Sequence, residues 1–354
     1  MSRFFSEKFA ELEAYVPGEQ PRDQQVIKLN TNESPFPPPP EVEKAVTEEW
    51  ERLRLYPDPE GLELRKALAQ RLGISPEEVL MTNGSDEALN FAFMAFCDRD
   101  TPAVFADITY GFYPVYARVN QVPFRVIPLK EDLSLDPKDY LQAGGTVFIA
   151  NPNAPTGLAL RRKEIEDILK QNRDHVVVID EAYVDFGAES CVPLIRKYDN
   201  LMVVQTFSKS RSLAGGRLGM AIGNAELIRD LNTIKYSTNP YNIDRLTMAA
   251  GIATLKNDEY NRQNCAAILR TRKWTAGRLK EMGFDMPYSS TNFLFVRHPA
   301  ISGEELYREL KNRGILVRHF DAERIRDYNR ITIGTREQME HLADAVETIL
   351  EGRR

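Results

Sequence analysis

The sequence predicts an α/β fold, with a large domain built on a mostly parallel central sheet flanked by helices and a smaller α+β domain after it. Short apolar runs alternate with amphipathic segments up to about residue 245, and this alternation is typical of strands joined by crossover helices. The run HVVVID at 175–180 is almost continuously apolar, as expected for a strand buried between two layers of helices. The length of 354 residues exceeds what one core usually serves.

The large domain is expected to contain a series of short strands separated by helices. Two helices follow from the spacing of their apolar residues: 85–96, and 161–172, where Ile165, Ile168 and Leu169 share one face. The expected strands lie at 79–83, 102–107, 122–129, 146–150, 175–180, 201–207 and 220–223.

After about residue 245 the sequence changes to long polar helical segments with few strands between them. The expected elements are a helical stretch at 244–282, strands at 292–297 and 329–335, and helices at 304–314 and 337–352. This pattern predicts a smaller α+β domain. The expected division is an N-terminal arm over 1–35 that joins the small domain, a large domain over 36–245 and a small domain over 246–354.

Composition and charge argue against several classes of function. The chain has 46 Lys and Arg against 52 Asp and Glu, a net charge of −6, whereas nucleic acids and acidic membranes are bound by clustered Lys and Arg. No apolar run approaches the roughly 18 residues that cross a membrane, and the first twenty residues lack the apolar stretch of a signal peptide. The three cysteines and four histidines are scattered, without the spacing of a disulfide framework or a metal site. We therefore expect no metal, nucleic-acid or membrane partner, and a location in the reducing cytoplasm.

Candidate binding residues follow the expected strands, where ligands of open α/β sheets collect. The strand at 79–83 is followed at once by Gly84, Ser85 and Asp86, which open a helix. Gly84 allows a tight turn, and the free backbone N–H groups at a helix start bind anions. A plain helix cap explains the same residues without a ligand.

Two further strand ends carry a carboxylate and a lysine. Asp180 ends the apolar strand at 175–180, and Tyr183 follows it; a carboxylate there needs a cation or donor, or caps the next segment. Lys209 follows Ser208 after the strand at 201–207, in a loop of small residues that reaches Arg217. An isolated lysine is usually a solvated surface residue, but this loop can wrap a phosphate, and Arg217 can fork onto it.

Taken together, these strand ends suit pyridoxal 5′-phosphate (PLP), a cofactor with an aldehyde, a pyridine ring and a phosphate. Lys209 would form a Schiff base with the aldehyde, Asp180 would keep the pyridine nitrogen protonated, and Tyr183 would hydrogen-bond the ring oxygen. Tyr110 could lie on the ring face, although core packing explains a tyrosine equally well. The phosphate would be held by the turn, loop and arginine described above, that is by Gly84, Ser85, Asp86, Ser208 and Arg217, and Thr206 is a further candidate cofactor-binding residue.

At these residues the chain resembles the fold type I PLP-dependent aminotransferases, and within them the histidinol-phosphate aminotransferases. The resemblance runs along nearly the whole chain, in the motifs AYVPGEQ (14–20), KLNTNESPF (28–36), RLYPDPEG (54–61), TNGSDE (82–87), TYGFY (109–113), NPNAPTG (151–157), VIDEAYVDF (178–186), TFSKSRSLAGGRLG (206–219), NPYNIDRLTMAA (239–250) and NRITIGT (329–335).

The resemblance implies a reaction and roles for further residues. The implied reaction interconverts L-histidinol phosphate and 2-oxoglutarate with imidazole-acetol phosphate and L-glutamate. Lys209 would also move the proton at the substrate Cα, and Arg330, assisted by Arg318, would bind the substrate carboxylate. Tyr56 would reach the neighbouring subunit's site in a homodimer. The N-terminal arm would close over the substrate through two of its residues, Tyr15 and Asn32.

One position departs from the family pattern. The family usually has asparagine before P-T-G, where its amide bonds the ring oxygen, and this chain has Ala154. Either Asn153 takes over this hydrogen bond or Tyr183 acts alone, and the expectation here is Asn153.

Two other activities occur on the same fold, an aromatic amino-acid aminotransferase and a phosphothreonine decarboxylase. A non-enzymatic α/β regulator finds no support, because no G-x-G-x-x-G follows the first strand.

Overall fold

The central element of the structure, a computed structural model that describes residues 2–10, 12, 18–20 and 26–353, is a seven-stranded sheet. Its order is β2-β8-β7-β6-β5-β3-β4; β8 runs antiparallel to both neighbours and all other pairs are parallel. The mostly parallel sheet is therefore confirmed. The strands span Val79–Asn83 (β2), Ala103–Ala106 (β3), Phe124–Ile127 (β4), Thr146–Ala150 (β5), Val177–Asp180 (β6), Leu201–Thr206 (β7) and Leu218–Gly223 (β8).

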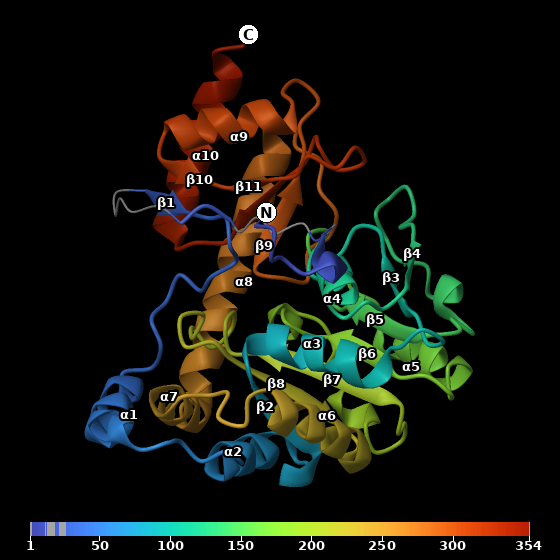
Figure 1. Ribbon diagram of the computed structural model, residues 1–354. Helices are drawn as coiled ribbons and strands as arrows, with labels where there is room; N and C mark the ends of the chain where they lie inside the picture. The colour runs from blue at the N-terminus through green and yellow to red at the C-terminus, as the bar shows by residue number, and fades with distance from the viewer. Residues whose placement is uncertain (1, 11, 13–17, 21–25, 354) are drawn as a thin grey trace.

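Helices cover both faces of this sheet (Figure 1). On one face, in contact with one apolar cluster, lie α2 (Leu62–Leu72), α5 (Arg162–Gln171) and α7 (Arg245–Lys256), with α1 (Glu41–Glu49) packed on α7. On the other face lie α3 (Gly84–Phe96), α4 (Tyr113–Val119) and α6 (Ala225–Thr238).

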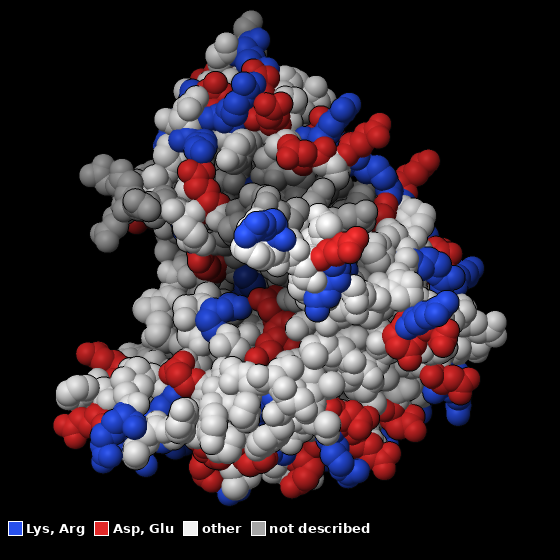
Figure 2. Space-filling view, in the orientation of Figure 1, with Lys and Arg blue, Asp and Glu red and all other residues white. Residues whose placement is uncertain are grey.

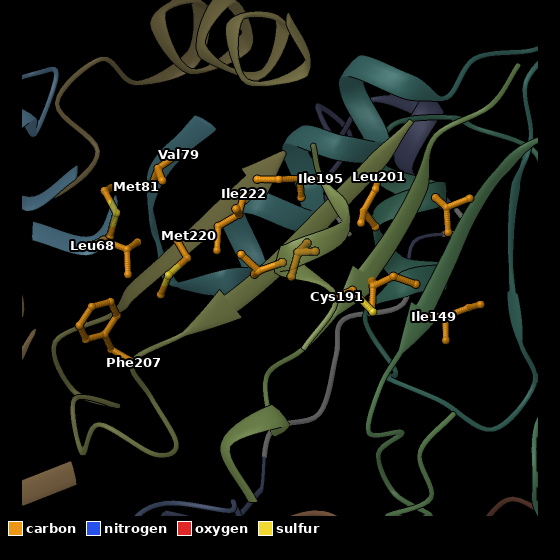
Figure 3. Packing of buried hydrophobic residues seen from close by; sticks show 14 of the residues in the cluster. Leu68, Val79, Met81, Ile149, Cys191, Ile195, Leu201, Phe207, Met220 and Ile222 are labelled. Atoms are coloured by element: carbon orange, nitrogen blue, oxygen red, sulfur yellow. The ribbon is translucent and has the colours of Figure 1, made fainter. Parts of the chain in front are cut away.

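Residues of the central strands alternate between the two apolar clusters, which explains their nearly continuous apolar sequences. In β7, Leu201 and Val203 face the first cluster, whereas Met202 and Val204 face the second. Figure 3 shows part of the first cluster, in which Leu201 of β7 and Ile222 of β8 lie on the same side of the sheet. Burial on both faces makes this sheet a rigid base for the loops at its strand ends.

The C-terminal part builds a second, smaller unit around its own apolar cluster. Figure 1 shows it above the large sheet, with the long helix α8 running between the two parts. The chain's first strand, β1 (Ile27–Lys28), pairs in parallel with β10 (Ile315–Leu316) of this unit. The three-stranded antiparallel sheet β11-β12-β9 and its helices span Phe293–Val296 (β9), Arg318–His319 (β11), Asn329–Thr332 (β12), Asp258–Glu281 (α8), Gly303–Asn312 (α9) and Arg336–Glu351 (α10).

The division of the chain into domains at residues 35 and 245 stays a prediction. Residues 245–256 form α7, which packs against α1 and α2 of the large unit. None of the helices in the part of the chain that the structure describes is long and apolar enough to cross a membrane.

Candidate active site

A cavity of about 340 Å³ lies at the carboxyl ends of β5, β6 and β7 and at the start of α3. Figure 2 shows a depression between the upper and lower parts of the molecule, with acidic and basic side chains inside it. Residues far apart in the sequence meet in this cavity, and most of the predicted cofactor residues line it: Ser85, Asp86, Tyr110, Asp180, Tyr183, Thr206, Ser208, Lys209 and Arg217.

The part of the cavity at the start of α3 carries hydrogen-bond donors suited to an anion. Helix α3 begins at Gly84 directly after β2, with φ at +70°, and the Gly84 N–H donates to the Arg217 carbonyl at 2.8 Å. A Cβ at this glycine would lie 2.6 Å from Nη2 of Arg217, so a larger residue would displace the guanidinium. In the same cavity, the hydroxyl groups of Thr206 and Ser208 are 3.0 Å apart. The helix start, hydroxyls and guanidinium together form a donor set suited to a phosphate.

Asp86 takes a role that its position in the sequence did not suggest. Its carboxylate accepts hydrogen bonds from Tyr110 Oη at 2.5 Å, Tyr116 Oη at 3.2 Å and Arg217 Nη2 at 2.9 Å. Burial, then the charge of Asp86, raises the pKa of Tyr110 far above its usual range, so the phenol stays protonated and continues to donate. Asp86 thus holds both Arg217 and the ring of Tyr110 in place at the cavity.

Asp180 lies buried at the base of the cavity, with 5% of its surface exposed. It accepts from Tyr113 Oη at 3.1 Å and from the Ala182 N–H at 3.2 Å. Burial is the main reason that its pKa is raised to about 6, and these two hydrogen bonds oppose that rise. The neighbouring Glu181 instead accepts from Ser190, Cys191 and Gln205, and Asp180 is the one of the two acids that lines the cavity.

The sequence-based prediction missed Tyr113 as a partner of Asp180. This tyrosine is fully buried and lies three residues after Tyr110, at the start of α4. The motif TYGFY contained it, but spacing along the chain does not reveal which tyrosine of a motif reaches a carboxylate on β6. The side chain became assignable only once α4 was placed against the sheet.

Lys209 lies where the cavity meets a second one of about 360 Å³, and both cavities share Thr31, Tyr110, Ala154, Tyr183 and Lys209. The lysine Nζ donates to the Thr31 carbonyl at 3.1 Å and lies 5.9 Å from the centre of the Tyr183 ring. The amine is therefore held at the junction of the two cavities.

The second cavity is lined by the predicted substrate residues Asn32, Arg318 and Arg330. Arg318 and Arg330 are opposite each other in the β11–β12 pairing, and Nη2 of Arg330 donates to the Asn30 carbonyl at 3.1 Å. Two guanidinium groups on neighbouring strands form a site suited to a carboxylate or a phosphate.

The contacts of Asn153 differ from those that its expected role requires. Its amide donates to the Ile108 carbonyl at 2.9 Å and to Thr156 Oγ1 at 3.1 Å, and its Oδ1 accepts from Thr109 at 2.8 Å. With both amide protons used in holding this loop, Asn153 does not supply a donor to the ring site, and it lines neither cavity, whereas Ala154 lines both. These contacts argue against the expectation that Asn153 replaces the missing asparagine.

One further predicted residue, Tyr56, lies outside both cavities. Tyr56 is 78% exposed and its ring stacks on Tyr241, with ring centres 4.6 Å apart. Tyr15 lies outside the residues that the structure describes.

The residues of the first cavity fit PLP in the nature and order of their groups. Phosphate donors stand at one end, a buried carboxylate stands at the base for a ring nitrogen, and a lysine and a phenol stand toward the second cavity. Tyr110 supplies an aromatic face held by Asp86.

Comparison with known proteins agrees with this geometry. The family model described as "Aminotransferase class I and II" matches residues 24–346. The histidinol-phosphate aminotransferase of Brachyspira hyodysenteriae is 48% identical, over 99% of this chain and 100% of that protein. The histidinol-phosphate aminotransferase of Acinetobacter baylyi is also 48% identical, over 98% of each chain.

A solved structure has the same fold. The crystal structure of histidinol-phosphate aminotransferase from Sinorhizobium meliloti in complex with pyridoxal-5′-phosphate superposes with a TM-score of 0.85, at 24% identity, over 93% of this chain and 92% of that one. On the family match and the two relatives, the chain belongs to the class I and II aminotransferases and, within them, to the histidinol-phosphate aminotransferases.

Proposed function

We propose that the protein is a PLP-dependent transaminase that interconverts L-histidinol phosphate and 2-oxoglutarate with imidazole-acetol phosphate and L-glutamate. The observation that carries the proposal is the position of Lys209 at the junction of two cavities, one with the donors for PLP and one with Arg318 and Arg330. The names of the relatives support the choice of substrate.

The first cavity would hold the cofactor by its two ends. The start of α3, Ser208 and Arg217 would bind the phosphate, and Asp180 would accept a hydrogen bond from the protonated pyridine nitrogen. When bound, PLP supplies an electron-accepting ring that stabilises negative charge at the substrate Cα. Tyr183 would donate its phenol proton to the ring oxygen, and Tyr110 would cover one face of the ring.

Lys209 would move the proton at the substrate. Its amine lies 3.1 Å from the Thr31 carbonyl, which orients the nitrogen when it is free of the cofactor. From this position Nζ would take the proton from the substrate Cα and deliver it to the cofactor carbon. Ping-pong kinetics are expected, because both substrates use the same site in turn.

Arg330 and Arg318 would bind the anionic group of each substrate. Arg330→Lys should raise KM for glutamate by about tenfold to a hundredfold, with a smaller change in kcat, because an ammonium cannot form the two parallel hydrogen bonds of a guanidinium. Steady-state kinetics with each substrate measure this split. Arg308→Lys on the exposed side of α9 is the matched control, and equal effects of the two variants would contradict the assignment.

A homodimer, with Tyr56 contributed across the interface, is part of the proposal. The segment before Tyr56 exposes several large apolar side chains, and a surface of this kind usually marks an interface. Arg245 holds the backbone of this residue by a 2.7 Å hydrogen bond to its carbonyl. The exposed apolar residues of this segment are Trp50, Leu53 and Leu55.

Subunit complementation tests whether Tyr56 acts across the interface. Tyr56→Ala and Lys209→Ala should each be strongly impaired alone, whereas coexpressing them should restore about a quarter of wild-type activity, because about half of the dimers are hybrids with one complete site. Two Lys209→Ala chains with different tags give the control. No restoration would place Tyr56 in its own subunit's site or outside any site.

We also propose that the protein works in the cytoplasm, on the support of its three cysteines, which are all buried and free.

A half-reaction assay tests the proposed substrate directly. The PLP form is mixed separately with histidinol phosphate, glutamate, phenylalanine and phosphothreonine, and the loss of the visible cofactor band and the release of CO₂ are followed. Fast loss with histidinol phosphate and glutamate supports the proposal. A preference for phenylalanine would instead indicate an aromatic aminotransferase, and release of CO₂ from phosphothreonine without a keto acid would indicate the decarboxylase.

A further inference from the structure

We infer that Asn32 is a positioning residue for Tyr183: its amide donates to the phenol oxygen and so directs the phenol proton into the cavity, toward the cofactor ring oxygen. This inference rests on the proposed function. It differs from the role expected for Asn32 as an arm residue that closes over the substrate.

The contact joins two segments that are distant in the sequence. Asn32 Nδ2 lies 2.9 Å from Tyr183 Oη, across 151 residues of chain. Asn32 is only 1% exposed, so water does not compete for its amide. Tyr183 lines both cavities, and its phenol is therefore in reach of a group bound in either one.

Thr332 on β12 determines which way the Asn32 amide points. The backbone N–H of Asn32 donates to Thr332 Oγ1 at 3.0 Å, and Thr332 Oγ1 lies 3.1 Å from Asn32 Oδ1. Because a backbone N–H can only donate, the threonine oxygen accepts from it and gives its own proton to Oδ1. The NH₂ group is then the end that faces Tyr183.

The backbone of Asn32 is held as firmly as its side chain. Its φ is +57°, a left-handed conformation in which asparagine and aspartate are favoured over other residues with a Cβ. Its carbonyl accepts from Asn292 Nδ2 at 3.0 Å. The side-chain hydrogen bond to Tyr183 therefore starts from a fixed point.

The hydrogen bond from Asn32 determines the direction in which the Tyr183 phenol donates its proton. Since Tyr183 Oη accepts from Asn32, its own proton points away from the amide, and an oxygen that accepts a hydrogen bond becomes a better donor. The two residues considered for the place of the family's asparagine are not suited to donate instead, because the Ala154 side chain is only a methyl group and the Asn153 amide donates to Ile108 and Thr156. Tyr183 is thus the donor on which the ring oxygen depends, and Asn32 orients it.

Asn32→Asp tests the inference with little change of shape. Aspartate keeps the left-handed backbone, but its carboxylate accepts the phenol proton and removes it from the ring oxygen. The phenol proton competes with the proton on the cofactor-linked lysine nitrogen for the ring oxygen. Its loss should therefore raise the pH midpoint of the holoprotein's visible absorption change by about one unit, the effect of one hydrogen bond to a charged group.

Tyr183→Phe is the reference variant, because it removes the phenol proton itself, and it should shift the midpoint by a similar amount. The double variant Asn32→Asp with Tyr183→Phe should show no larger shift, because both substitutions remove the same hydrogen bond. Thr332→Val, which frees the amide to rotate, should move the midpoint in the same direction by less, and Thr332→Ser, which keeps the hydroxyl, should hold the wild-type value. These two variants test the inference even if Asn32→Asp fails to fold.

The outcomes separate the inference from the proposed function. A shift in Tyr183→Phe with wild-type midpoints in Asn32→Asp and Thr332→Val would overturn the role of Asn32 and leave the function standing. Wild-type protein that takes up no PLP, or that shows no pH-dependent visible band, would overturn both. Shifts in all three variants support the inference.

Discussion

Replacing Lys209 with alanine should lower steady-state transamination by about 10⁴-fold or more, because in the proposed function this residue supplies both the covalent attachment of the cofactor and the base at the substrate Cα. Cofactor binding should survive in part, since the phosphate donors at the start of α3, at Ser208 and at Arg217 remain. The measurements are kcat with histidinol phosphate and the affinity for PLP by equilibrium dialysis.

The matched control is Lys197→Ala, which removes a lysine paired with Glu166 on the surface. It should leave both quantities near wild type. Steady-state transamination by Lys209→Ala within tenfold of wild type would contradict the assignment of this lysine.

Replacing Asp180 with asparagine should lower kcat by at least about a hundredfold, in the range found when one charge-stabilising group is removed from a site. An amide does not keep the pyridine nitrogen protonated, and an unprotonated ring is a poor electron acceptor. Tyr113→Phe, which removes one hydrogen bond to Asp180 but keeps the carboxylate, should have a much smaller effect. Equal losses in the two variants would show that packing rather than the charge of Asp180 matters.

The same substitution has an opposite effect on the stability of the cofactor-free protein. The pKa of Asp180 is raised from 3.8 to about 6, so this carboxyl is without penalty below pH 4 and destabilises the fold as pH rises through 6, by about 3 kcal/mol. The asparagine variant avoids this cost but loses about 1 kcal/mol, because its NH₂ group cannot accept one of the two hydrogen bonds.

Urea unfolding of the cofactor-free protein at two pH values measures this effect. Asp180→Asn should exceed wild type by about 2 kcal/mol in free energy of unfolding at pH 8, and should fall below wild type, by up to about 1 kcal/mol, once the pH is below 4. A variant less stable than wild type at pH 8 would show that the buried carboxyl carries no ionisation cost.

The sheet and the strand-end residues were predictable from the sequence because both follow from local patterns. Strands buried on both faces give uninterrupted apolar runs, and the polar groups at their carboxyl ends stand out against them. Asp180 and Lys209 were found in this way, and the sheet order β7-β6-β5 brings their strands together.

The contacts of the site that the sequence did not reveal depend on packing between distant segments. Asn153 and Ala154 are neighbours in one loop, and only the packing of that loop against Ile108 and Thr109 decides which of them faces the cavity. In the same way, nothing in the sequence near Asn32 shows that it meets Tyr183. The contact of Asn32 also requires the small unit to be placed on the large one, because Thr332 of β12 holds this residue.

Peptide mass spectrometry after borohydride reduction of the PLP-loaded protein tests the central claim most directly. Reduction makes the bond between the cofactor aldehyde and its lysine permanent, so the modified peptide identifies the residue. The cofactor mass on Lys209 alone, absent from Lys209→Ala, is the predicted result. The mass on a different lysine of the wild-type protein, or on none, would contradict the account.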